Sequence, residues 1–218
     1  MEILAASDLH GNHDTYSWLA QVVTSRKPEA VVLAGDLLGV PDHFDSVEDA
    51  QRHDAGYVRS LLEELEVPVL FIMGNDDWVE LEPRNDRLRP LHMHPVRLGP
   101  YTFVGYQYTL PFMGGINERP EGAIATDLTS LEKALNHDSI LVTHSPAHGT
   151  LDHGVVGKPV GSVSIRETLF RCPVRAHIHG HIHECFGRVG NHFNVAAGRH
   201  RRAMLINLAS LTHEVLTR

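Results

Sequence analysis

Short apolar segments that alternate with helical segments constrain this chain most. Residues 2–7, 30–34 and 68–73 are apolar runs typical of buried strands. Between them, apolar residues recur at helical spacing from residue 13 or 14 to 26, and again from about 50 to 65. Strand and helix alternating through short connections indicate an α/β fold with a largely parallel sheet. In such sheets, ligands bind beyond the carboxyl ends of the strands.

The second half of the chain is less regular but gives further predictions. Residues 101–108 and 139–142 read as strands, and residues 130–135 as a short helix. Long loops are expected over residues 109–126 and 145–161. A capping box beginning at Ser164 predicts a helix to about residue 171. Residues 174–178 then form a strand, and the tail from 188 to 218 is expected to form antiparallel strands. With no repeat or linker, we expect one domain over residues 1–218.

Composition excludes several classes of protein. No stretch of eighteen apolar residues exists, and the first residues carry no export signal, so we expect a cytoplasmic protein with no membrane segment. The net charge of −8 and the lack of a basic arm argue against a nucleic-acid partner. The two cysteines form no CxxC pattern, so they suggest neither a disulfide framework nor a thiolate metal site. Seventeen histidines in 218 residues instead indicate metal ligation or pH sensitivity.

Metal-ligating side chains follow five of the predicted strands. They form the ordered set Asp8-x-His10, Gly35-Asp36, Gly74-Asn75, His144 and Gly180-His181-x-His183. Carboxylate and imidazole without thiolate suit divalent Mn, Fe, Ni or Zn. Seven ligands are too many for one tetrahedral ion, but they suit two divalent ions that share one carboxylate. Taken singly, each could instead be a hydrogen-bonded histidine at a strand end, a helix N-cap or a turn residue.

This pattern resembles the calcineurin-like metallophosphoesterase superfamily, and the C-terminal half resembles its compact prokaryotic Icc-like branch. The resemblance implies a four-layer αββα sandwich of two mixed β-sheets flanked by helices. It also implies that Asp8, His10 and His183 bind the first metal, that Asn75, His144 and His181 bind the second, and that Asp36 bridges them. A hydroxide held between the ions would attack phosphorus in a small-molecule phosphate ester.

The third motif departs from the family pattern. Members with a complete acid–base machinery usually carry a histidine directly after Gly-Asn, whereas this chain has Asp76. A carboxylate beside two cations should be ionised at pH 7 and therefore a poor proton donor. We expect weak turnover of poor leaving groups and a preference for phosphodiesters or activated phosphomonoesters. His148 or His153 could act as the proton donor instead.

Other residues near the motifs carry weaker predictions. His13 could contact phosphate or simply begin a surface helix, and Trp78 could form a wall of the substrate pocket. His177 and His179 lie deeper in their strand, where a structural role is favoured. The acidic stretch at residues 42–49 is expected to be solvated, with a lid or a contact in a homo-oligomer as the alternative. A metal-binding scaffold or regulatory protein with weak catalysis is the main alternative function.

Overall fold

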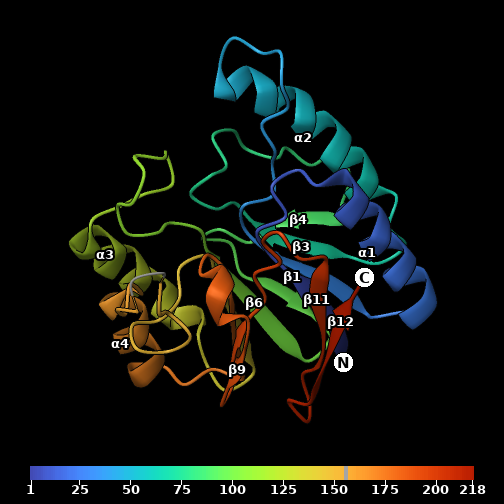
Figure 1. The fold of residues 1–218 in the computed structure, drawn as a ribbon. Coiled ribbons are helices and arrows are strands. Elements are labelled where there is room, and N and C mark those ends of the chain that lie inside the picture. The colour runs from blue at the N-terminus through green and yellow to red at the C-terminus, as the bar shows by residue number, and fades with distance from the viewer. Residues whose placement is uncertain (155–156) are drawn as a thin grey trace.

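The computed structural model describes residues 1–154 and 157–218, which form two six-stranded sheets (Figure 1). The first sheet has the order β12 (His213–Thr217), β11 (Arg202–Asn207), β1 (Glu2–Ala6), β2 (Ala30–Ala34), β3 (Val69–Ile72) and β4 (Leu88–Pro90). The second has the order β5 (Val96–Leu98), β6 (Tyr101–Tyr106), β7 (Ser139–Thr143), β8 (Ala176–His179), β10 (His192–Asn194) and β9 (Gly187–Val189). Both sheets are mixed, because parallel central strands join antiparallel neighbours.

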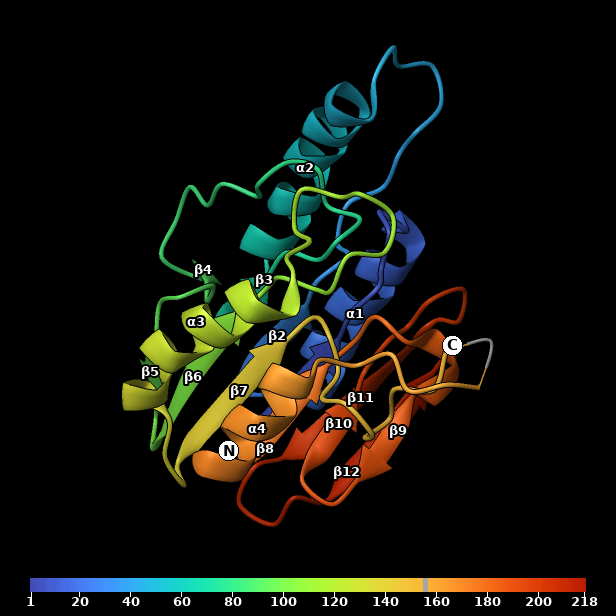
Figure 2. The same cartoon turned by 90° about the vertical axis from the view of Figure 1, so that its left-hand side faces the viewer.

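Four longer helices flank the sheets. The helices α1 (His13–Arg26) and α2 (Val47–Glu63) lie on one side of the molecule, and α3 (Glu121–Leu131) and α4 (Val163–Arg171) lie on the other (Figures 1 and 2). Two short 3₁₀ helices, η1 (Glu132–Ala134) and η2 (His183–Cys185), follow α3 and β8. The predicted four-layer αββα sandwich is therefore confirmed.

Alternating side chains explain why the layers form. Ile3 belongs to the hydrophobic core between the two sheets, whereas its neighbour Leu4 packs under α1 and α2. Val32 and Val31 of β2 divide between the same two cores. Because successive strand residues point to opposite faces, a run without polar residues fits a strand that is covered on both faces. A third core lies between the second sheet and the helices α3 and α4.

The parallel register brings the motif residues to one edge of the first sheet. Ala6 at the end of β1 pairs with Leu33, and Ala34 at the end of β2 pairs with Ile72. The residues that follow β1, β2 and β3 therefore leave the sheet side by side. The strands β6, β7 and β8 are parallel as well, so the residues after β7 and β8 also share an edge.

Several predicted boundaries are wrong. The predicted loop 109–126 ends at Pro120, where α3 begins, and α3 buries Ile124 and Leu128 against α4 and the second sheet. The helix predicted at 130–135 is only the end of α3 together with η1. Glycine and charge in this segment obscured two helical turns with buried positions.

Helix starts and the tail also differ from expectation. The cap of α4 is Ser162, whose hydroxyl accepts the Ile165 N–H at 3.2 Å, and not Ser164. The helix predicted from residue 50 begins at Val47. The short strands β4 and β5 were not predicted, and β10 pairs with β8 in parallel instead of joining a purely antiparallel tail.

Among the described residues, no helix is long and apolar enough to cross a membrane.

Candidate metal centre

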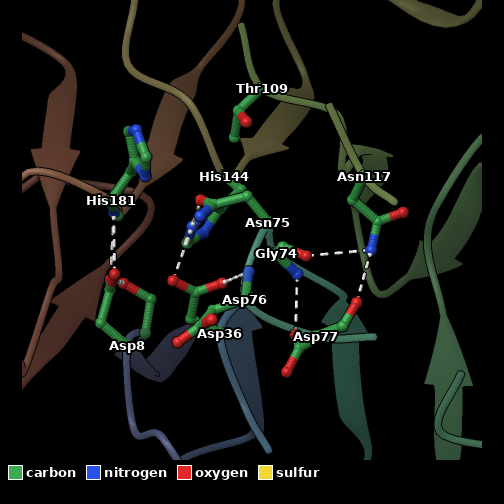
Figure 3. A network of polar contacts seen from close by, with 12 residues as sticks. Asp8, Asp36, Gly74, Asn75, Asp76, Asp77, Thr109, Asn117, His144 and His181 are labelled. Carbon is green, nitrogen blue, oxygen red and sulfur yellow. Dashed lines mark hydrogen bonds and ion pairs between the residues drawn. The ribbon is translucent and has the colours of Figure 1, made fainter. Parts of the chain in front are cut away.

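The predicted ligands lie beyond the carboxyl ends of strands from both sheets, and Figure 3 shows five of them, Asp8, Asp36, Asn75, His144 and His181. The first sheet supplies four of them, Asp8 and His10 after β1, Asp36 after β2, and Asn75 after β3. The second sheet supplies His144 after β7, and His181 and His183 after β8. The site is therefore assembled from the ends of five strands that lie far apart in the sequence.

Four of these residues have a left-handed backbone. The φ angles are 57° at Asp8, 44° at His10, 53° at Asp36 and 69° at His181. Residues other than glycine seldom adopt this conformation, which is destabilising by roughly 1–3 kcal/mol at each position. Such strain persists where surrounding structure imposes it, and it clusters at functional sites. All four are predicted metal ligands, and they follow the strands β1, β2 and β8.

Close backbone approaches explain two of the motif glycines. A Cβ at Gly180 would lie 2.1 Å from Ser7 Oγ and 2.4 Å from Asp8 Oδ2. A Cβ at Gly74 would lie 2.1 Å from Asp36 Oδ1. Only glycine leaves these carboxylates in place, so the glycines are part of how the site is built.

The carboxylate of Asp36 lies between two of the predicted ligand sets. Its Oδ2 is 3.2 Å from His144 Nε2 and 3.9 Å from His10 Nε2. Its Oδ1 accepts the backbone N–H of Asp76 at 2.8 Å. His144 Nδ1 lies 2.7 Å from the carbonyl oxygen of Ala34, so Nδ1 carries the proton and Nε2 faces Asp36.

Asp8 occupies the other side of the site. Its Oδ1 is 3.0 Å from His183 Nε2, and the backbone N–H of His181 donates to both oxygens at 3.2 and 3.1 Å. The hydroxyl of Ser7 donates to Oδ2. These contacts fix the orientation of a carboxylate that is fully buried.

Two overlapping groups of side chains could each hold an ion. Asp8, His10 and His183 offer ligand atoms within 4.8 Å of one another, as do Asp8, Asp36 and His144. Asp8 belongs to both groups, while Asp36 faces one histidine from each predicted set. Near them, Asn75 Oδ1 lies 3.1 Å from His144 Nε2, and the ring centroids of His144 and His181 are 5.2 Å apart.

The buried carboxylates dominate the electrostatics. Burial alone would lower the pKa of His144, but the negative charge of Asp36 raises this pKa to about 10. Burial likewise lowers the pKa of His10, while the carboxylates of Asp76 and Asp36 raise it to about 9. In contrast, burial and the nearby His144 lower the pKa of His181 to about 4.

The raised pKa values of His144 and His10 show that the site favours positive charge, as a metal site should. The two buried carboxylates create a negative potential that attracts positive charge, and the facing imidazoles present nitrogen atoms toward it. A divalent cation would supply that charge and displace the protons, because ligation requires neutral imidazole. The donor set of carboxylates, imidazoles and an amide oxygen fits borderline divalent ions.

A cavity of about 670 Å³ opens over this site. Its polar lining residues are His10, Asp36, Asn75, Asp76, His181, His183 and Glu184. The rest of its described lining is Leu110, Pro111, Phe112, Met113, Gly154, Val160 and Ile182. Five of the seven candidate ligands therefore line the polar end of a pocket that is otherwise apolar, while Asp8 and His144 are fully buried.

Three predicted residues do not line this cavity. His148 Nδ1 faces the Arg166 guanidinium at 3.3 Å, and His13 Nε2 lies 2.6 Å from Asp54 Oδ1 while its ring packs on Tyr57. Trp78 lines a neighbouring cavity of about 460 Å³. None of the three is among the described residues that line the larger cavity.

The two other strand histidines lie behind the ligands. His177 is buried, with its Nε2 2.8 Å from the Thr143 hydroxyl and its Nδ1 3.0 Å from His192 Nδ1. Burial holds the pKa of His177 well below its ordinary value and lowers that of His179 to about 3. Both rings are thus neutral packing groups under the site.

Sequence reasoning missed two residues that shape the site. The buried carboxylate of Asp77 accepts the backbone N–H groups of Leu37, Leu38 and Gly74. Burial and the charge of Asp36 raise its pKa to about 7. The amide of Asn117 donates to the carbonyl oxygens of Gly74 and Asp77 at 2.9 and 3.1 Å (Figure 3). Asp77 was visible as the second aspartate after Asn75, whereas no sequence signal marks Asn117.

Comparison with known proteins identifies the family. A sequence model of the calcineurin-like phosphoesterases matches residues 1–185, so the chain belongs to this family of phosphoesterases. No curated protein gave a significant sequence match.

Solved structures share the fold at low sequence identity. TT1561 of Thermus thermophilus is 16% identical, with a TM-score of 0.75 over 99% of this chain and 98% of that one. A dimetal phosphatase from Danio rerio is 13% identical, with a TM-score of 0.62 over 100% and 98%. GAP50, the anchor in the inner membrane complex of Plasmodium, is 12% identical, with a TM-score of 0.52 over 100% and 88%. These likenesses define the architecture.

Proposed function

We propose that this protein hydrolyses phosphate esters with two divalent metal ions. Asp8, His10 and His183 would hold one ion, Asn75, His144 and His181 the other, and Asp36 would contact both. The observation that carries this proposal is the position of Asp36 Oδ2. It lies 3.2 Å from His144 Nε2 and 3.9 Å from His10 Nε2, and these two histidines belong to different ligand sets. An anionic bridge of this kind offsets the repulsion between two cations.

The ions would stabilise charge on the phosphoryl oxygens and lower the pKa of water so that it can act as a nucleophile near neutral pH. The chain's own residues position that chemistry. The Ala34 carbonyl holds His144 in the tautomer that presents Nε2, and Ser7 with the His181 backbone holds Asp8. These buried contacts keep the ligands oriented, which fixes the geometry around the reacting phosphorus.

Charge supports a preference for phosphodiesters or activated monoesters. Asp76 places a half-exposed carboxylate at the cavity, with Oδ2 3.2 Å from His10 Nδ1. A cationic proton donor at this position would instead speed the hydrolysis of esters with poor leaving groups. A carboxylate repels a dianionic monoester more strongly than a singly charged diester. An acidic leaving group needs little protonation, so it tolerates the missing acid.

Metal-dependent turnover tests the proposal. The chelated protein would be assayed with Mn, Fe, Ni or Zn on a bis-aryl phosphodiester, an aryl monoester and a cyclic nucleotide. We expect hydrolysis only with metal. Residues that merely orient a metal ligand contribute about 10- to 100-fold, so the loss of the proposed ligand in Asp36→Asn should lower kcat by at least about 100-fold. Asp36→Asn should also lower the metal content measured by mass spectrometry, whereas the exposed Asp86→Asn should leave both quantities unchanged.

The alternative is a metal-binding scaffold with the same fold. Asp76 in place of an acid favours it, and a structural neighbour is described as an anchor. Binding of two ions without hydrolysis of any of the three substrates would support this alternative and reject the enzyme.

A further inference from the structure

An apolar lip forms one side of the cavity over the metal centre. We define the apolar lip as Leu110, Pro111, Phe112 and Met113, together with Val160 from the loop before α4. Phe112 is 70% exposed, Met113 76% and Val160 39%, although all three line the cavity. Large apolar side chains that stay exposed beside a polar site are a sign of a binding surface.

The lip is held in a defined conformation. The carboxylate of Glu118 accepts the backbone N–H groups of Phe112 and Met113 at 2.7 Å and that of Gly114 at 3.0 Å. Partial burial would raise the pKa of Glu118, but these donors hold it below its ordinary value. Three hydrogen bonds to one charged group fix the backbone of the lip, so the exposed side chains project from an ordered turn.

The lip is also fixed relative to the metal centre. Asn117, next to Glu118, donates to the carbonyl of Gly74 at 2.9 Å. The backbone of Gly115 packs so closely on Asn75 that a Cβ there would lie 2.3 Å from the Asn75 carbonyl oxygen. The ring of Phe112 lies edge-on to His181, with centroids 5.9 Å apart. An ester group beside the ions would therefore reach the lip.

The charges around the cavity limit how much negative charge a substrate can carry beyond one phosphate group. Among the described residues, none of those lining the cavity is lysine or arginine. Asp76 and Glu184 line it as carboxylates instead. Substrates with several phosphates would leave the additional negative charge without a partner, which is unfavourable in a partly desolvated site.

We infer that the substrate is a singly charged phosphodiester in which one ester group is apolar, of the size of an aryl ring or a medium alkyl chain. This inference rests on the proposed phosphoesterase function. The phosphate lies at the polar end of the cavity, and the apolar ester group packs against Phe112, Met113 and Val160. Burial of an apolar group in a defined pocket supplies binding energy in proportion to its area.

A series with one leaving group tests the inference. Methyl, phenyl and octyl p-nitrophenyl phosphates each release p-nitrophenolate, so the leaving group stays the same. The oxygen of water bonds to phosphorus, the bond from phosphorus to the p-nitrophenyl oxygen breaks, and the protons of water pass to solvent. Below the micelle concentration, kcat/KM should be about 10- to 100-fold higher for the phenyl and octyl diesters than for the methyl diester.

Variants of the lip should remove that preference. Phe112→Ser and Met113→Ser should bring the octyl-to-methyl ratio of kcat/KM toward one, and Glu118→Gln should lower it by loosening the turn. Phe170→Ser is the matched control, because Phe170 is 87% exposed on α4 and lies outside the cavity lining. Its ratio should equal that of the wild type, and thermal unfolding would show that every variant is folded.

The possible failures are distinguishable. Equal kcat/KM values along the series would reject the apolar ester group while leaving the phosphoesterase function standing. Release of p-nitrophenolate from p-nitrophenyl phosphate alone would also reject the inference, whereas no release from this monoester or from any diester, with metal bound, would reject the proposed function itself. If Phe112→Ser abolished sedimentation with phosphatidylcholine vesicles but left the ratio unchanged, the lip would be a membrane contact and the inference would be wrong.

Discussion

The carboxylate of Asp77 accepts the backbone N–H of Leu37 at 2.9 Å, although the two residues lie on the loops after different strands, β3 and β2. It also accepts the N–H groups of Leu38 and Gly74. One buried side chain thus holds together the two loops that carry Asp36 and Asn75.

Asp77→Asn should destabilise the protein. Asparagine keeps the shape but has one acceptor oxygen, so at least one buried N–H loses its partner. A buried N–H that loses its acceptor costs about 1–3 kcal/mol, and the free energy of unfolding should fall by roughly this amount. Denaturant unfolding of the chelated protein measures this, with the exposed Asp86→Asn as control. A loss no larger than in that control would show that Asp77 does not stabilise the loops.

Gly180→Ala should disrupt the metal centre without a change of charge. The added Cβ would overlap Ser7 Oγ and Asp8 Oδ2, so Asp8 must move. We expect a loss of metal affinity of about 10- to 100-fold, as for other changes that misorient a ligand. Gly122→Ala is a suitable control, since nothing lies within 4 Å of its Cβ and alanine favours the helix α3. Titration with Mn would compare the two variants, and equal affinities would contradict the close approach.

Asp76→His tests the missing proton donor. A histidine at this position would face the cavity and could protonate a leaving oxygen. General acid catalysis contributes about 10²–10⁴-fold, so the rate on an alkyl phosphodiester should rise by at least about 10-fold. The rate on a bis-aryl diester, whose leaving group needs little protonation, should change much less. An unchanged alkyl rate would mean that the carboxylate is not what limits turnover.

Acid should destabilise the protein partly through His92. Burial lowers the pKa of this ring to about 4, against an opposing effect of Asp127, while Arg119 and His94 add to the lowering. The unfolded chain therefore binds more protons between pH 6.5 and 4, and the stability contributed by neutral His92 is lost as the pH falls through this range. For a partly exposed ring, this contribution is on the order of 1–2 kcal/mol.

His92→Asn should weaken that pH dependence. The asparagine oxygen can still accept the Gln107 N–H that His92 Nδ1 accepts at 3.2 Å. Guanidinium unfolding at pH 7.5 and 5 would show a smaller loss of stability in the variant than in the wild type. The exposed His137→Asn serves as control, and identical pH dependence in all three proteins would remove His92 from the explanation.

The parts of the fold that could be predicted are those with a local signal. The strand at residues 30–34 and the helix ending at Arg26 have the predicted bounds, because each combines a clear apolar pattern with a local stop. The start of α3 was missed because glycine, proline and charge in residues 109–126 indicate a loop, and because its partner, α4, begins about 40 residues later. The short strands β4 and β5 depend on pairing with β3 and β6, which no local pattern shows.

The candidate site divides in the same way. Asp8, Asp36 and His144 could be predicted because each follows a recognisable strand, and the structure brings their ligand atoms together. The supporting residue Asn117 could not, because its bonds to Gly74 and Asp77 exist only in three dimensions. Ligand roles, a single domain, a cytoplasmic location and homo-oligomers stay predictions.

The distribution of the ligands between the sheets has a mechanical consequence. Asp8 and Asp36 extend from the first sheet, while His144 and His183 extend from the second, over sequence separations of more than a hundred residues. Ions at this position would cross-link the two halves of the sandwich and stabilise the folded chain, because their binding site does not exist in the unfolded chain. The same ions would then serve both catalysis and the stability of the fold. A chelator would therefore lower the melting temperature together with the activity.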